Sequence, residues 1–67
     1  MTPTTYRATL SDLGLSQARL GRLLGVNKDT PTNWGKGDAE IPRAVALLLG
    51  LMAAGTVTIE GLEAIAR

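Results

Sequence analysis

The residues best suited to chemistry form one polar segment in the first half of the 67-residue chain. The segment covers residues 27–33, with the sequence Asn-Lys-Asp-Thr-Pro-Thr-Asn, and Trp34 follows it. Its amide, ammonium, carboxylate and hydroxyl groups can donate and accept hydrogen bonds in several geometries. They do not make a catalytic set, because the chain contains no histidine to act as a base and no cysteine to act as a nucleophile. We therefore expect this segment to bind a partner.

The same missing residue types argue against an enzyme and against a metalloprotein. Histidine and cysteine are the usual zinc ligands, and a chain without cysteine forms no disulfide. Among the six acidic residues we find no plausible pair for an acid–base couple. The sequence predicts no enzymatic activity, no cofactor, no metal and no small-molecule ligand.

Neither a membrane segment nor a signal peptide is expected. The longest apolar run, residues 44–49, has six residues, whereas a membrane-spanning helix needs about 20. Residues 1–7 lack the basic and then apolar pattern of a signal peptide. We expect one cytoplasmic domain over residues 1–67.

The charge of the chain is compatible with nucleic-acid binding but does not by itself predict it. Seven basic and six acidic residues give a formal net charge of +1, much less than a coat protein for nucleic acids carries. Six of the basic residues lie within residues 7–43, against four acidic ones. Tyr6 and Trp34 are the only aromatic residues, which are too few for stacking on single-stranded bases.

Five short helices are expected to position the polar segment. Helices begin at capping residues and end at glycines that tolerate a left-handed conformation, and no strand-like alternation of useful length interrupts this pattern. On this basis we expect helices over residues 2–14, 16–25, about 28–36, 42–55 and from residue 58 onward. The predicted fold class is all-α, a compact bundle of about five short helices.

The third of these helices can begin in two ways. Asn27 can cap a helix that starts at Lys28, but Pro31 then occupies the fourth position and removes the first intrahelical hydrogen bond. Thr30 can instead cap a shorter helix in which Pro31 is the first residue. Gly35 is a poor helix former and is expected to shorten the helix after Trp34. The sequence therefore predicts a short or distorted third helix.

The fourth helix is apolar almost all round. Such a helix is buried on every side or shared with another molecule, and the first arrangement is difficult in so short a chain. We expect residues 42–67 to contribute to a homodimer. The residues predicted at that interface are Leu48, Leu51, Met52, Ile59 and Leu62.

Residues 15–37 have the layout of a helix-turn-helix unit, with the motif itself at residues 16–36. The first helix needs a very small residue where the second crosses it, and Gly21 is at that place. Gly25 supplies the left-handed turn, and Trp34 is placed to anchor the second helix in the core. The polar residues between the turn and Trp34 are then expected to face outward.

This segment resembles a known family. Residues 15–27, Leu-Ser-Gln-Ala-Arg-Leu-Gly-Arg-Leu-Leu-Gly-Val-Asn, followed by Trp34, Gly37 and Pro42-Arg43, are similar to the Cro/C1 (phage-repressor, XRE-like) helix-turn-helix family. The resemblance implies a lambda-repressor-like DNA-binding domain and a dimeric transcriptional regulator of bacterial or phage origin. Such a regulator reads an inverted-repeat operator in double-stranded DNA through the major groove. Repression, including repression of its own promoter, is the simplest expected outcome.

The resemblance also implies roles for individual residues. The positions that read base edges hold Lys28, Asp29, Thr32 and Asn33. Asparagine suits adenine, lysine suits guanine, and aspartate can accept a hydrogen bond from the cytosine amine. The positions that contact DNA phosphates hold Gln17, Lys36 and Arg43, and Arg43 lies where the N–H groups of a helix start can also bind a phosphate.

A second interpretation keeps the fold and changes the function. If Pro31 and Gly35 degrade the third helix, the chain is a protein-interaction module, such as an antitoxin or an adaptor, that binds DNA weakly. Sequence-specific, salt-sensitive DNA binding distinguishes the two interpretations.

Overall fold

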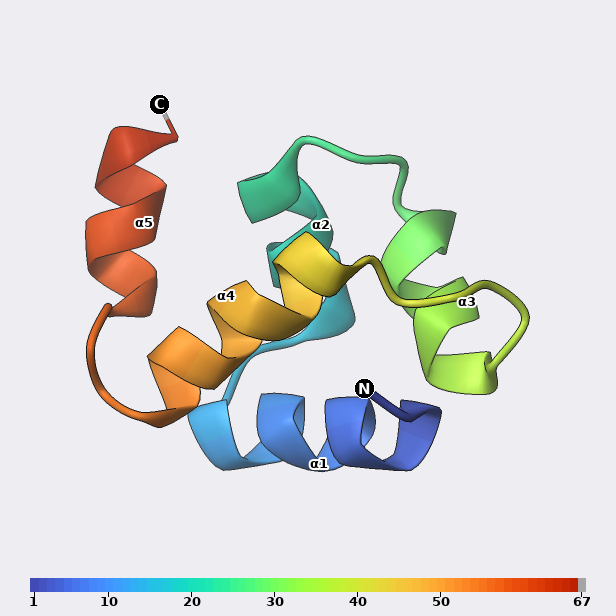
Figure 1. The fold of residues 1–67 in the computed structure, drawn as a ribbon. Coiled ribbons are helices and arrows are strands. Elements are labelled where there is room, and N and C mark those ends of the chain that lie inside the picture. The colour runs from blue at the N-terminus through green and yellow to red at the C-terminus, as the bar shows by residue number, and fades with distance from the viewer. Residues whose placement is uncertain (67) are drawn as a thin grey trace.

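The computed structural model of the protein describes residues 1–66 and contains five helices there. In chain order they are α1 (Pro3–Leu13), α2 (Gln17–Leu24), α3 (Asp29–Lys36), α4 (Arg43–Ala53) and α5 (Ile59–Ile65), as Figure 1 shows. No strand occurs in this part of the chain. The predicted all-α class and the number of helices are therefore confirmed. None of these helices has the length and apolar character that crossing a membrane requires.

Hydrogen bonds between cap side chains and the backbone fix three of the helix starts. The Thr2 and Ser16 hydroxyl oxygens accept hydrogen bonds from the N–H groups three residues later, at 3.1 and 3.0 Å, and Thr58 does the same at 2.9 Å. Each bond satisfies one of the N–H groups that a helix start leaves free. Gly25 ends α2 in the left-handed conformation, with a φ of 70°, which a residue without a Cβ adopts at no steric cost.

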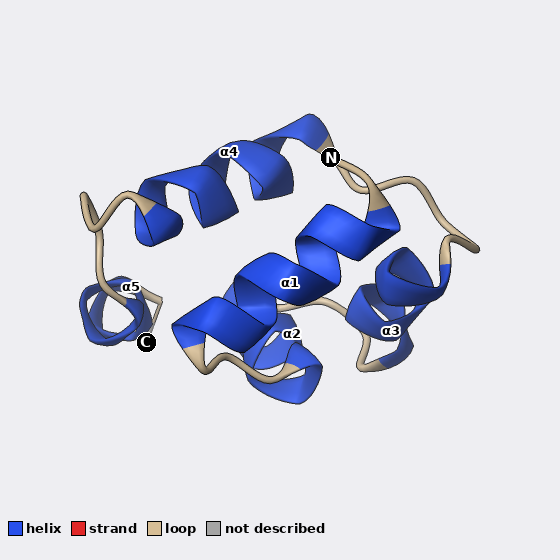
Figure 2. Ribbon diagram, turned by 90° about the horizontal axis from the view of Figure 1, so that it is seen from below, coloured by secondary structure: helices blue, strands red, loops and turns tan. Residues whose placement is uncertain are grey.

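α1 lies along one face of the molecule, below the other helices in the view of Figure 1. Figure 2 shows α4 on one side of it and α2 and α3 on the other, and α1 packs against both α3 and α4. The core between these helices contains one residue or more from each of the first four. Its buried apolar side chains are Tyr6, Leu10, Leu15, Leu20, Trp34, Ile41, Val45, Leu49 and Met52.

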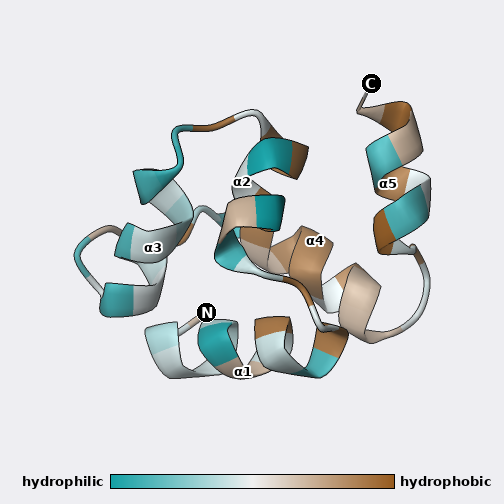
Figure 3. Cartoon of the chain, turned by 180° about the vertical axis from the view of Figure 1, so that it is seen from behind, coloured by the Kyte–Doolittle hydropathy of each residue, from teal (hydrophilic) through white to brown (hydrophobic). Residues whose placement is uncertain are grey.

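α4 buries one face and exposes another. Val45, Leu49 and Met52 point into the core, while Leu47 is 61 % exposed and Leu51 45 % exposed. Met52, which the sequence analysis placed at a dimer interface, is only 4 % exposed and belongs to the core of its own chain. Periodicity could not separate these residues, because nearly every residue of α4 is apolar (Figure 3). The remaining predicted interface residues are partly buried against the core and are Leu48, Ile59 and Leu62.

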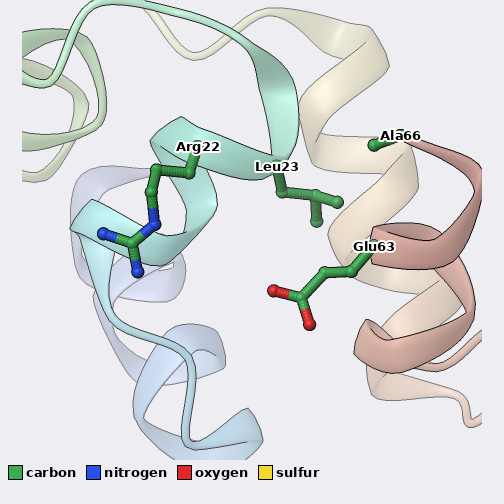
Figure 4. A pocket seen from close by; sticks show the side chains of 4 residues that line it. All are labelled: Arg22, Leu23, Glu63 and Ala66. Atoms are coloured by element: carbon green, nitrogen blue, oxygen red, sulfur yellow. The ribbon is translucent and has the colours of Figure 1, made fainter.

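α5 is the least embedded helix. None of its residues is buried, and Ile65 is 82 % exposed. Two hydrogen bonds from the Arg19 guanidinium in α2 to the Glu63 carboxylate, at 2.9 and 2.6 Å, connect α5 to α2. An open pocket lies between α2 and α5, and Leu23 and Glu63 point into it (Figure 4). The hydrogen bonding with Glu63 raises the pKa of Arg19 above its usual value.

Candidate nucleic-acid interface

The start of α3 differs from both capping schemes that the sequence allowed. The helix begins at Asp29, whose N–H donates to the Asn27 side-chain oxygen at 2.9 Å, and the Asn27 carbonyl accepts from the Thr30 N–H at 3.0 Å. Pro31 is therefore the third residue of the helix. The N–H of a third helical residue has no partner within the helix, so proline removes no hydrogen bond there. Pro31 does not distort the helix start.

α2 and α3 pack closely at Gly21 and Pro31. A Cβ on Gly21 would lie 3.2 Å from the Pro31 Cγ, and Pro31 is among the most completely buried side chains. The expected need for a very small residue at this crossing is confirmed. Pro31 supplies the apolar surface that packs against α2.

α1 holds the buried side of α3 through two aromatic residues. The rings of Tyr6 and Trp34 meet edge to face, with centroids 6.2 Å apart and planes at 88°. The Tyr6 hydroxyl donates to the Pro31 carbonyl at 2.9 Å. Burial raises the pKa of Tyr6 to about 12, because the ionised phenolate would lose its hydration. The predicted role of Trp34 as a core anchor is confirmed by its 4 % exposure.

The other side of α3 is polar and open to solvent. Asp29 and Lys36 are exposed and Asn33 is partly exposed. These three residues follow one another at spacings of four and three, which places them on one helical face. That face lies opposite the buried residues Pro31 and Trp34. The structure therefore gathers these predicted contact residues on a single outward surface.

Two further predicted base-reading residues flank this face. Lys28 is exposed immediately before α3, and Thr32 is partly exposed along its side. Neither side chain donates or accepts a hydrogen bond within the described residues, so both are available to a partner.

Gly35 does not shorten α3, which continues to Lys36 and ends at Gly37. Gly35 instead allows a close approach. A Cβ there would lie 2.5 Å from the Gln17 amide nitrogen and 3.5 Å from the Tyr6 ring. Gly35, which was expected to shorten the helix, is the position where α1, α2 and α3 meet.

The predicted phosphate-contacting residues begin or end helices around α3. Gln17 is the first residue of α2, Lys36 is the last residue of α3, and Arg43 is the first residue of α4. Lys36 and Arg43 are exposed, and Gln17 is partly exposed. The loop between Lys36 and Arg43 also exposes two carboxylates, Asp38 and Glu40. The electrostatic character of this edge is therefore mixed.

The sequence analysis did not predict the hydrogen-bond partners of two arginine side chains. Arg7 of α1 donates to the Gly35 carbonyl, and Arg19 pairs with Glu63, which lies 44 residues away in the chain. Helical spacing indicates that both arginines lie on helices, but it does not predict hydrogen bonds to residues that are far away in the sequence. Only the packing of α1 on α3, and of α5 beside α2, brings these groups together.

The side chains on the outward face of α3 offer hydrogen-bonding groups and charges. No group of three or more acidic, histidine or cysteine side chains within residues 1–66 is arranged to hold a metal ion.

Comparisons with models of protein families, with curated proteins and with solved structures find no match to this chain.

Proposed function

We propose that the protein is a sequence-specific, double-stranded DNA-binding transcriptional regulator of the Cro/C1-type helix-turn-helix class. The observation that carries this proposal is the division of α3 into two sides. Pro31, Trp34 and Gly35 are buried against α1 and α2, and the opposite face is polar and unoccupied within the chain. A short helix held in this way fits the major groove, which is about 12 Å wide.

The outward face of α3 offers groups that suit base edges. Asn33 can both donate to and accept from adenine, and Lys28 can donate to the acceptors of guanine. Asp29 can accept from the amine of cytosine, and its place in the first helical turn is also favoured by the helix dipole. Thr32 extends the same surface with a hydroxyl group.

Phosphate contacts supply the affinity that base contacts do not. Gln17 begins α2, Lys36 ends α3 and Arg43 begins α4. Within residues 27–43, however, the three cations Lys28, Lys36 and Arg43 are balanced by three carboxylates, on Asp29, Asp38 and Glu40. We therefore expect weak binding to arbitrary DNA and selective binding to a site that suits the α3 face.

A homodimer would place two such helices on one operator. α4 exposes Ala44, Leu47 and Leu51, and the exposed C-cap residue Ala54 continues the spacing of three and four residues, which forms an apolar stripe along one side of the helix. No charged residue occurs between Arg43 and Glu60. A two-fold contact through this stripe buries Leu47 and Leu51, and an inverted repeat with half-sites about one helical turn apart follows from such symmetry. Repression by occupying a promoter in the cytoplasm, including the protein's own promoter, is the simplest regulatory outcome.

The test is selection of bound duplexes from a random DNA pool, followed by anisotropy titrations of the enriched site at two salt concentrations. We expect an enriched inverted repeat whose affinity falls when Asn33 is replaced by alanine, by about 1–3 kcal/mol for a lost bidentate base contact. Ser11→Ala is the matched control, since Ser11 is exposed on α1. Absence of any enriched sequence would overturn the proposal in favour of a protein-interaction module, such as an antitoxin or adaptor.

A further inference from the structure

Arg7 reaches from α1 to the end of the proposed recognition helix. Its Nη1 group donates to the carbonyl of Gly35 in the last turn of α3. The last four carbonyls of a helix have no partner within that helix, and a cation is favourable at this end of the helix dipole. Arg7 therefore fills a vacant acceptor on α3 from outside that helix.

The bond to Gly35 occupies only part of the guanidinium group. An arginine side chain carries five N–H donors, and the one hydrogen bond that Arg7 makes uses a neutral carbonyl. Within residues 1–66, no carboxylate forms an ion pair with Arg7, and the residue is exposed. Arg7 thus retains its full positive charge and several free donors.

Gln17 meets the same residue of α3 from α2. The Gln17 amide nitrogen lies 2.5 Å from the place that a Cβ of Gly35 would occupy, so the amide group lies directly over the Gly35 backbone. Arg7 and Gln17 are ten residues apart in sequence and belong to different helices. The absence of a side chain at Gly35 leaves room for the Gln17 amide, and Arg7 reaches the carbonyl of the same residue.

We propose that Arg7 and Gln17 bind one DNA backbone phosphate together, beside the C-terminal half of α3. This inference rests on the proposed DNA-binding function. The guanidinium supplies the charge, and the Gln17 amide supplies a neutral donor. The bond to the Gly35 carbonyl holds Arg7 in place before DNA arrives, which reduces the conformational entropy lost on binding. A phosphate fits better than a base edge, because Arg7 lies on α1 and outside the outward face of α3.

The test is the salt dependence of binding to the selected duplex. Each neutralised phosphate adds about 0.9 to the slope of log affinity against log salt concentration. The slope for Arg7→Met is therefore expected to be about 0.9 shallower than for the wild type. The loss of affinity is then about 3.5-fold larger at 50 mM salt than at 200 mM. The loss is expected to be equal on selected and scrambled duplexes, as for any phosphate contact.

Three further variants separate a phosphate contact from a purely structural role. Arg7→Lys keeps the charge and is expected to keep the slope. Arg7→Gln removes the charge and keeps an N–H donor, so it gives the same readout if Arg7→Met does not fold. Arg22→Met is the matched control, because Arg22 is exposed on α2 and makes no hydrogen bond within the described residues. We expect its slope to match that of the wild type.

The outcomes also distinguish this inference from the proposed function. Selective binding by the wild type with an unchanged slope in both neutral Arg7 variants would overturn the shared phosphate contact and leave Arg7 as a cap on α3. A wild-type protein without any preferred duplex would overturn the proposed function itself. Loss of slope in the Arg7 variants, with no additional affinity lost when Gln17→Ala is combined with Arg7→Met, supports a shared phosphate.

Discussion

The Tyr6 hydroxyl of α1 donates a 2.9 Å hydrogen bond to the Pro31 carbonyl of α3. Both side chains are completely buried. Four residues further along α3, the Gly35 carbonyl accepts a hydrogen bond from Arg7, the next residue of α1. Neighbouring residues of α1 thus hold α3 by two backbone carbonyls one helical turn apart. The orientation of α3 therefore does not depend on the exposed side chains that are proposed to read DNA.

Replacing Tyr6 with phenylalanine tests this connection. We expect the free energy of unfolding at neutral pH to fall by about 1 kcal/mol, the net value of a typical hydrogen bond. Above pH 10 the difference between the two proteins should shrink. The pKa of Tyr6 is about 12 in the folded chain and near 10 when unfolded. The stability that its neutral form contributes is therefore complete below pH 10 and is lost as the pH rises through 12. Urea titrations of both proteins from pH 7 to pH 12 measure this effect, and a constant difference across that range would contradict it.

The Gly21–Pro31 crossing makes a prediction about packing. Alanine at position 21 gains about 1 kcal/mol in helix propensity, but its Cβ would lie 3.2 Å from a buried proline ring. Overpacking of this kind costs about 1–3 kcal/mol, so we expect Gly21→Ala to destabilise the protein by about 1 kcal/mol. Gly50→Ala is the control, because Gly50 is inside α4 with no atom within 4 Å of a new Cβ. Thermal melting should show a lower midpoint for Gly21→Ala and a higher one for Gly50→Ala.

Local signals in the sequence were enough to predict most helix boundaries. Thr2, Ser16 and Thr58 each make a hydrogen bond to an N–H group only three residues away, so the information lies within one helical turn. Trp34 was predicted in the core because its position suits the large apolar residue that anchors the second helix of such a layout, and it is buried. These features require no knowledge of the tertiary structure.

The other features depend on contacts between residues that are distant in the sequence. From the sequence alone Gly35 is only a poor helix former, and the fold is needed to show that the Gln17 side chain lies over it. Met52 and Leu51 are neighbours of similar hydrophobicity, and only packing against α1 determines that Met52 is buried and Leu51 exposed. The start of α3 follows neither scheme, because Asn27 accepts hydrogen bonds through both its side chain and its carbonyl and the helix begins at Asp29.

The ion pair between Arg19 and Glu63 makes a prediction about α5. Both side chains are about one-third exposed, at 35 % and 37 %, so water and salt screen their attraction and the pair contributes only weakly to stability. Glu63→Gln is expected to lower the free energy of unfolding slightly at low salt and by less at 1 M salt. Hydrogen exchange should become faster in α5 while α1 remains unchanged. Glu60→Gln serves as the control on the same helix, and an equal effect from both variants would contradict a specific role for the pair.

Gly35→Ala is expected to separate DNA affinity from stability. The added Cβ would meet the Gln17 amide nitrogen at 2.5 Å, whereas its contact with the Tyr6 ring, at 3.5 Å, is ordinary. The flexible end of Gln17 can swing away, so the free energy of unfolding should change by less than about 1 kcal/mol, the size of the propensity gain. Affinity for the selected duplex should fall about 2- to 10-fold, as for the loss of one hydrogen bond. Gln17→Ala should cause a similar loss, and adding Gly35→Ala to it should cause no further loss, because both substitutions remove the same contact. Additive losses in anisotropy titrations of the two single variants and the double variant would show that Gly35 serves DNA binding independently of Gln17.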